Sequence, residues 1–328
     1  MNAGAHPRDT RIDPYANDPG RLGVSLLSLA ELVIPCLEVV GARSVIEVGA
    51  YAGDLTELLL EWAAGSNARV VAVDPSPQRE LIVLDERRAD LDLVREPSLD
   101  ALRRLELPDA VVIDGDHNYY TVSQELRLIA ERAAGRTLPL LMLHDVGWPH
   151  GRRDDYFAPE LVPEEYRQPT VEGGGLLPGD PGTSEEGMPY RWPAAKEGGP
   201  RNGVLTAIED FVASRPTLRV AIVPAFFGLG IVWDAEAHWG EAVEEIVEPW
   251  DRNPLVQRLE TNRAYHLVSD RFQIRRAGSE KERGARKDEL LRRLLTSRTL
   301  ALAERISRLR QRGEPAFSKD EVRRALGE

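Results

Sequence analysis

Short apolar runs alternate along the chain with segments whose apolar residues recur every three or four positions. The runs predict buried parallel strands at 44–50, 69–75, 91–96, 109–116 and 138–145. The helical spacing predicts helices between them, at 54–65, 98–105 and 121–135, with Ser98 as an N-cap. Strands that alternate with helices indicate a parallel sheet covered on both faces. The predicted fold is therefore α/β, a Rossmann-like, doubly wound and mostly parallel sheet.

Segments of other character precede and follow this alternation. Residues 23–40 have helical spacing, and Pro35 predicts a kink or break near Ile34. Two apolar runs around a glycine-containing turn predict an antiparallel hairpin over 218–234, which ends the sheet. The remaining residues, 236–328, show mostly helical spacing and are expected to form a helical C-terminal extension.

The predicted organisation has three parts. These are an N-terminal arm and helix at 1–43, a sheet domain at 44–235 and the extension at 236–328. Within the sheet domain, residues 146–201 contain 9 Pro and 10 Gly and lack periodicity. This insertion also carries six aromatic residues, so we expect a lid over a substrate. An oligomer contact or disorder is the alternative interpretation.

Composition narrows the classes of partner. The net charge is −12, which opposes general attraction to nucleic acid or an anionic membrane. No stretch reaches the roughly 18–20 apolar residues that cross a bilayer. Cys36 is the only cysteine, which excludes an intramolecular disulfide and favours a cytoplasmic, reducing compartment. An Arg-rich helix with a Leu/Ile stripe at 285–312 predicts packing or self-association, so a homo-oligomer is expected.

A glycine loop follows the first predicted strand. The sequence VIEVGAYAGDLT spans 45–56 and includes an acid followed by two glycines. Glycine lets the backbone approach a nucleotide-type ligand at the carboxyl ends of such strands. The spacing differs from the dinucleotide motif G-x-G-x-x-G, which argues against a nicotinamide-dependent oxidoreductase. The second strand ends at Asp74, 21 residues after Gly53, where a carboxylate can accept both hydroxyls of a ribose.

Polar residues also end the fourth and fifth predicted strands. IDGDHNYY spans 113–120, and LHDVGWPH spans 143–150. Asp114, Asp116 and Asp145 are hard oxygen ligands of the kind that Mg²⁺ prefers. His144 is a further candidate ligand or partner, and His117 has a pKa suited to accepting a proton at neutral pH. The plainer interpretation gives both histidines structural roles, and His150 is interpreted as a loop histidine.

These motifs resemble those of class I S-adenosylmethionine (SAM)-dependent methyltransferases. The resemblance covers 44–235 and is most specific to the group with macrocin-type O-methyltransferases and cephalosporin-hydroxylase-like proteins. It implies a list of SAM-binding residues: Glu47, Gly49, Ala50, Tyr51, Gly53, Asp74, Glu96, Ser98 and Asp114. Catechol-type O-methyltransferases, more distantly similar, imply metal ligands at Asp114 and Asp145 and a base near His117. Their further strand-five ligand falls on Val146, so metal dependence stays open.

The resemblance implies methyl transfer from SAM to a hydroxyl of a small polar molecule, either a sugar or a phenolic intermediate. His117, His144 and Asp145 are the predicted catalytic residues, with Mg²⁺ as a candidate cofactor at Asp114, Asp116 and Asp145. N-methylation is the alternative enzyme reaction. A SAM- or nucleotide-binding scaffold without catalysis is the alternative from another class.

Overall fold

The computed structural model describes residues 25–296, 298, 302, 305–306 and 322–323. Residues 1–24 of the predicted N-terminal arm and helix lie outside the described residues, and so does most of the chain after 296. The chain divides into two compact units, Met1–Val268 and Ser269–Glu328. The first unit contains the sheet. Residues 236–268, which we predicted as part of the extension, therefore belong to the same unit as the sheet.

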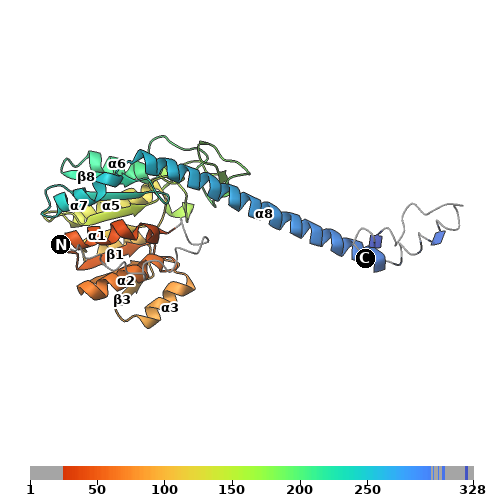
Figure 1. The fold of residues 1–328 in the computed structure, drawn as a ribbon, viewed down its shortest axis with the longest axis horizontal. Coiled ribbons are helices and arrows are strands. Elements are labelled where there is room, and N and C mark those ends of the chain that lie inside the picture. Colours follow the sequence, from red (N-terminus) through yellow and green to blue (C-terminus); the bar gives the residue numbers. More distant parts are fainter. Residues whose placement is uncertain (1–24, 297, 299–301, 303–304, 307–321, 324–328) are drawn as a thin grey trace, which may run out of the picture. The chain divides into compact units, whose positions relative to one another are not determined.

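Seven strands form one sheet in the order β3-β2-β1-β4-β5-β9-β8 (Figure 1). Their bounds are Ser44–Val48 (β1), Arg69–Val73 (β2), Leu91–Val94 (β3), Ala110–Ile113 (β4), Leu140–His144 (β5), Leu218–Val223 (β8) and Leu229–Asp234 (β9). The first five strands pair in parallel, whereas β9 is antiparallel to both β5 and β8. The Rossmann-like sheet with its terminal antiparallel hairpin is confirmed.

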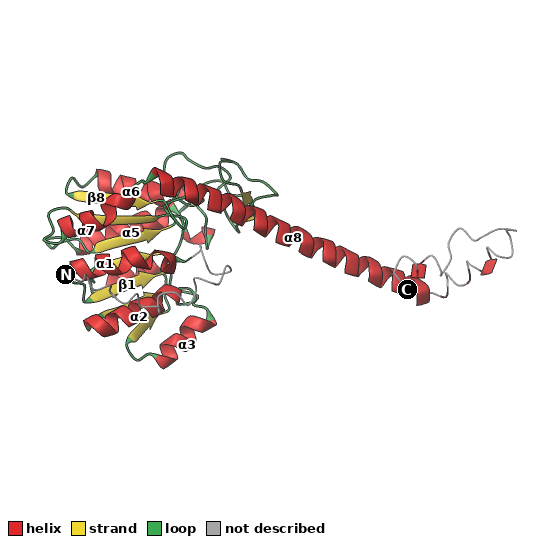
Figure 2. Cartoon of the chain, viewed as in Figure 1, coloured by secondary structure: helices red, strands yellow, loops and turns green. Residues whose placement is uncertain are grey.

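Helices cover both faces of the sheet (Figure 2). One face packs against Ala30–Val40 (α1), Asp54–Ser66 (α2) and Gly240–Val247 (α7). The other packs against Ser98–Arg104 (α4), Tyr119–Arg132 (α5) and Val204–Ala213 (α6). Each strand sends alternate side chains to the two faces, so two apolar cores form. The carboxyl ends of the five parallel strands consequently lie at one edge, where the predicted site residues meet.

Three local predictions are corrected. Pro35 lies inside α1, which continues from Ala30 to Val40 without a break. The residues around it, Val33, Cys36 and Leu37, are fully buried, and this packing outweighs the missing backbone hydrogen bond. Ser98 is the first residue of α4 and not its cap, because Pro97 occupies the cap position. Helix Arg79–Arg87 (α3) was not predicted.

The 146–201 insertion has a defined fold with little regular structure. It contains two short 3₁₀ turns, Pro159–Leu161 (η3) and Glu164–Tyr166 (η4), and a small hairpin of Gly175–Leu176 (β6) and Met188–Pro189 (β7). Three buried polar side chains hold it together. Arg153 donates to the carbonyls of Ala194, Pro181 and Gly182 at 2.6–3.0 Å.

Asp154 and Asn202 continue this network toward the sheet domain. Asp154 Oδ1 accepts from the backbone N–H groups of Tyr119 and Gly203, both at 2.7 Å. Asn202 accepts from the Asp154 N–H at 2.7 Å and donates to the carbonyls of Lys196 and Gly198. The insertion is thereby fastened to the start of α5 and to the residue before α6.

A 3₁₀ turn, Glu248–Trp250 (η5), links α7 to the 43-residue helix Pro254–Thr296 (α8). Within the first unit, Ala264 and Val268 of α8 are buried. The part of the chain described here holds no helix with the length and apolar character needed to cross a membrane.

Candidate functional site

The glycine loop after β1 lies directly against the end of β4. Gly49 has a φ of +84°, and its N–H donates to the Val73 carbonyl at 2.8 Å. A Cβ at Gly49 would overlap the backbone carbonyl of Asp114. Only glycine therefore fits at this position. We refer to residues 49–53 as the cofactor cradle, because nucleotide-type ligands lie at the carboxyl ends of the strands in such folds.

Asp74 fastens this loop from the end of β2. Its Oδ2 accepts from the Tyr51 N–H and its Oδ1 from the Ser76 N–H, both at 2.7 Å. The side chain is buried. A carboxylate has further lone pairs, so Asp74 can still accept hydrogen bonds from a ribose.

Glu47 lies beneath the loop and is buried in the sheet. Its Oε2 accepts from the Thr56 hydroxyl at 2.6 Å. Burial raises the pKa of Glu47 to about 8. Thr56 is also fully buried, so this pair orients the loop from behind.

The predicted adenine-side residues are less closely assembled. Glu96 is half-exposed and forms an ion pair with Arg104 at 2.9 Å. Behind Ser98 lies Glu125 of α5, which is fully buried, and its two oxygens have no hydrogen-bond partner among the described residues. Burial raises the pKa of Glu125 to about 8.

His144, at the end of β5, is held at both ring nitrogens. Its Nε2 lies 2.7 Å from the Phe226 carbonyl oxygen, which can only accept, so Nε2 carries a proton. Its Nδ1 lies 3.0 Å from Asp114 Oδ1 and 3.4 Å from Asp145 Oδ2. Burial alone would lower the pKa of His144. The carboxylates of Asp114 and Asp145 have the larger combined effect and raise this pKa to about 9.

His117 lies in the loop between β4 and α5 and faces the same two carboxylates. Its Nε2 lies 3.0 Å from Asp145 Oδ2 and 3.6 Å from Asp114 Oδ1. Burial alone would lower the pKa of His117. The carboxylates of Asp145 and Asp114 have the larger combined effect and raise this pKa to about 10. Burial disfavours the Asp114 carboxylate, yet His144 and His117 hold its pKa well below the usual range.

The cluster fits a divalent cation, with one change to the predicted ligand set. One atom each of Asp114, His144 and Asp145 lie within 4.8 Å of one another. Asp116 is not in this group, because its carboxylate accepts from the Thr121 hydroxyl at 2.9 Å and the Phe157 N–H at 3.2 Å. Two carboxylates and an imidazole suit Mn²⁺ or Zn²⁺ better than Mg²⁺, which prefers oxygen alone.

The insertion adds three side chains that the sequence interpretation did not place here. The His150 ring stacks on His117 with centroids 4.7 Å apart, and Tyr190 meets His150 edge-on at 4.9 Å. Asp155 is tied to this group because its N–H donates to the His117 carbonyl at 3.0 Å. His150 lies in a loop, as predicted, but its side chain is buried against His117. Its position five residues after Asp145 was the available signal.

Glu125 and Tyr190 were also not predicted from the sequence, and only Glu125 lies in a recognisable sequence pattern. Glu125 lies between Val122, Leu126 and Ile129 on the buried stripe of α5, so helical spacing alone places it inside. Tyr190 is 45 residues beyond Asp145, and no local pattern connects them.

Residues 46–146 match the model of a family described as a methyltransferase domain. No curated protein matches the chain. Among solved structures, the chain is similar to the S-adenosylhomocysteine (SAH)-bound methyltransferase PaMTH1 of Podospora anserina. The identity is 16%, the match covers 64% of this chain and 79% of that one, and the TM-score is 0.39.

Two further structures have comparable scores. Cofactor-bound Rv0187 from MTB is 17% identical, with coverage of 71% of this chain and 99% of that chain and a TM-score of 0.38. A methyltransferase from Geobacter sulfurreducens is 13% identical, with coverage of 71% and 92% and a TM-score of 0.36. At such scores the likenesses carry no assignment of substrate or cofactor to this chain.

Proposed function

We propose that the protein transfers the methyl group of SAM to a hydroxyl of a small polar molecule, because residues 46–146 match the model of a methyltransferase domain and lie in a Rossmann-like sheet. The acceptor class that best suits the site is a sugar or a phenolic compound, which presents hydroxyl groups to histidine and carboxylate side chains.

One observation carries this proposal. The backbones of Gly49 and Asp114 touch, so the cofactor cradle and the His/Asp cluster share one wall. A methyl donor held over Gly49 would therefore lie beside an acceptor held at Asp114, His117 and Asp145. Methyl transfer needs this adjacency, because the sulfonium is already activated and the enzyme has mainly to align the two reactants.

The reaction is an in-line displacement. The acceptor oxygen forms a bond to the methyl carbon as the carbon–sulfur bond breaks, and SAH leaves as a neutral thioether. The acceptor hydroxyl gives its proton to neutral His117, which lies 3.0 Å from Asp145 and is held by it. His144 acts by positioning, since it is anchored to Phe226 and fixes the Asp114 carboxylate.

A divalent cation held by Asp114, His144 and Asp145 would lower the pKa of the acceptor hydroxyl. It would also offset the two carboxylate charges that favour protonated His117. The Nε2–H of His144 is engaged by Phe226, which leaves Nδ1 as the ligand atom.

The test begins with calorimetric titration of the full chain with SAH. Micromolar binding is expected. A screen of hydroxylated sugars and phenols with SAM, read by mass spectrometry, should then give a product 14 Da heavier whose formation is slowed at least tenfold in His117→Ala and Asp145→Ala. Absence of SAH binding would contradict the proposal. Full turnover in both variants would remove the roles given to these side chains.

A further inference from the structure

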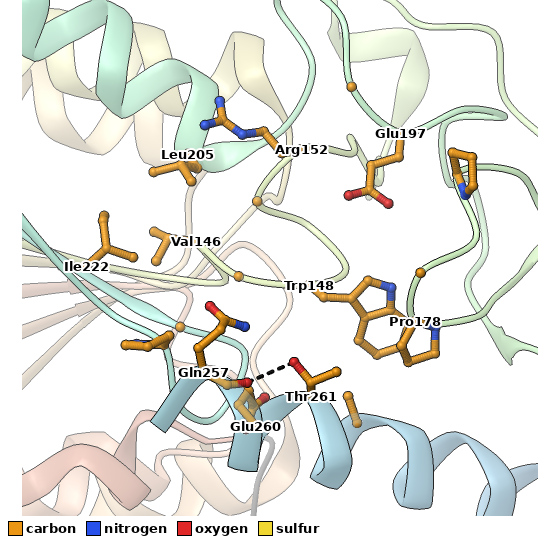
Figure 3. A pocket seen from close by; sticks show the side chains of 18 residues that line it. Val146, Trp148, Arg152, Pro178, Glu197, Leu205, Ile222, Gln257, Glu260 and Thr261 are labelled. Atoms are coloured by element: carbon orange, nitrogen blue, oxygen red, sulfur yellow. Dashed lines mark hydrogen bonds between the residues drawn. The ribbon is translucent and has the colours of Figure 1, made fainter. Parts of the chain in front are cut away.

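A second cavity lies at the same edge of the sheet, beyond the ends of β5 and β8. Its volume is about 670 Å³, a size typical of small-molecule sites. The insertion, the turn before β9 and the first turns of α8 surround it (Figure 3). Exposed Gln257 and Thr261 of α8 stand at its rim. None of the residues assigned to methyl transfer lines it.

The tight turn at 146–151 separates this cavity from the His/Asp cluster. Gly151 N–H donates to the Gly147 carbonyl and closes the turn. Trp148 lines the cavity on one side, whereas His150 stacks on His117 on the other. The 146–151 turn therefore lies between the cavity and the His/Asp cluster, and the two are separate sites.

One wall of the cavity is held rigid by two buried side chains of the polar network that also anchors the insertion. Pro181, Glu197 and Gly198 belong to loops without regular structure, yet they line the cavity. Arg153 binds the Pro181 carbonyl and Asn202 binds the Gly198 carbonyl, each at 2.8 Å. Both side chains are 1% exposed. Such buried support is the way in which a preformed binding site keeps its shape.

The opposite wall is equally fixed. Glu260 of α8 accepts from the N–H groups of Phe226 and Phe227 at 3.0 and 2.9 Å, and both residues have positive φ. Arg263 pairs with Glu260 at 2.6 Å and lies over the Phe227 ring at 4.6 Å. The turn at Phe226 and Phe227 is thus fixed to α8 by these contacts.

The lining specifies a ligand with a ring and a hydrogen-bond donor. Its apolar surface comes from Trp148, Pro178, Pro181, Leu205, Ile222 and Pro224. Figure 3 shows the Trp148 ring beside Pro178, with the Gln257 side chain on α8 across the pocket from them. Among the described residues, none forms a hydrogen bond with the Gln257 side chain. The Thr261 hydroxyl donates to the backbone carbonyl of Gln257.

The charge of the lining excludes an anion. Arg152 is neutralised by a bidentate pair with Glu209 at 2.6 Å. Glu197 lines the cavity, whereas its cationic partner Arg153, 4.0 Å away, does not. Among the described lining residues, the cavity surface therefore presents the carboxylate of this pair and no unpaired cation, which favours a hydroxyl or an ammonium group over an anion.

We propose that this cavity is a second small-molecule site, distinct from the methyl-transfer site, which binds an uncharged or cationic aromatic compound through Trp148, Gln257 and Glu197. The site goes beyond the proposed methyl transfer and does not depend on it.

The test follows the indole N–H signal of Trp148 in the full chain, by ¹⁵N NMR without SAM or SAH. The chain has 6 tryptophans, and Trp148→Phe assigns the signal. The probes are tyramine (cation), 2-(4-hydroxyphenyl)ethanol (uncharged) and 3-(4-hydroxyphenyl)propionate (anion). We expect saturable shifts with the first two, at dissociation constants of about a millimolar or tighter, and at least threefold weaker binding of the anion.

Two matched variants locate the binding. Thr261→Trp places a ring at the rim and should abolish the shifts, whereas Asn262→Trp, at an exposed neighbour that does not line the cavity, should retain them. Glu197→Gln should remove the preference for tyramine over the anion. No shift with tyramine and the alcohol would overturn the proposal. Shifts that disappear in His117→Ala would overturn it as well, because they would place the probe at the methyl-transfer site.

Discussion

His117 and His150 stack with ring centroids 4.7 Å apart, yet their surroundings favour opposite protonation states. The carboxylates beside His117 favour its cation. Burial, and then the charge of His117, lower the pKa of His150 to about 3. A neutral ring from the insertion therefore lies against the predicted base and fixes its plane without competing for a proton.

The pH dependence of turnover should reveal His117 as the base. Only the neutral ring accepts a proton, so kcat with an acceptor from the screen should rise with pH on the acid side. Asp145→Asn removes a carboxylate 3.0 Å from the ring and should lower the pKa. The acid limb should then move by about one pH unit or more toward lower pH. An unchanged limb would mean that His117 is not the group that titrates.

Gly49→Ala should weaken SAH binding by at least tenfold in calorimetry, because the added Cβ overlaps the Asp114 carbonyl. Gly41→Ala is the matched control. Gly41 also has a positive φ, of +66°, but a Cβ there meets nothing within 4 Å. The control should lose about 1 kcal/mol of stability and keep its SAH affinity. Equal affinity in both variants would argue against the cradle.

Metal preference should follow the mixed nitrogen and oxygen donors. After chelator treatment, Mn²⁺ or Zn²⁺ should bind more tightly than Mg²⁺ in calorimetry. Asp145→Asn should weaken this binding at least tenfold. Asp116→Asn should leave it unchanged, because Asp116 is engaged by Thr121 and Phe157. Binding that depends on Asp116 would restore the ligand set expected from the sequence.

The buried Arg153 should matter far more for stability than its exposed neighbour. Arg153→Met leaves the carbonyls of Ala194 and Pro181 without their donor and should cost about 2–4 kcal/mol in urea unfolding. Arg152→Met removes a half-exposed ion pair with Glu209 and should cost about 1 kcal/mol or less. Similar losses in the two variants would contradict the role assigned to Arg153.

Glu125 should make the fold less stable as pH rises. Burial raises its pKa in the folded protein to about 8, from 4.5 for a freely exposed glutamate. Between these values the folded state keeps a proton that the unfolded state has lost, so stability falls by up to about 1.4 kcal/mol per pH unit. Glu125→Gln should flatten the dependence of unfolding free energy between pH 5 and 8. The exposed Glu131→Gln should not, and equal slopes in all three proteins would refute the assignment.

The parallel sheet could be predicted because its strands and helices have clear periodicity. Helix α3 was not predicted because it has only 9 residues and its apolar residues, Leu81–Leu84, form one continuous run, which periodicity alone does not distinguish from a strand. The glycine loop and Asp74 were found because their geometry is local.

The insertion and its contribution to the site could not be derived in this way. Its shape depends on hydrogen bonds between distant residues, such as Arg153 with Ala194 and Asp154 with Gly203. Asp116 shows the same limit at the cluster. It follows Asp114 by two residues and was grouped with it, but its direction is set by Phe157 from the insertion.

The two ends of the insertion lie next to each other. His150 and Gly151 accept hydrogen bonds from the N–H groups of Val204 and Leu205 at 2.9 and 3.0 Å. Residues 154–202 therefore leave and rejoin the sheet domain at one point, with their own internal buried polar network. A segment attached in this way can change in length or sequence without displacing Gly49 or Asp74. If the protein acts as proposed, changes in this segment would alter acceptor preference while cofactor binding stays the same.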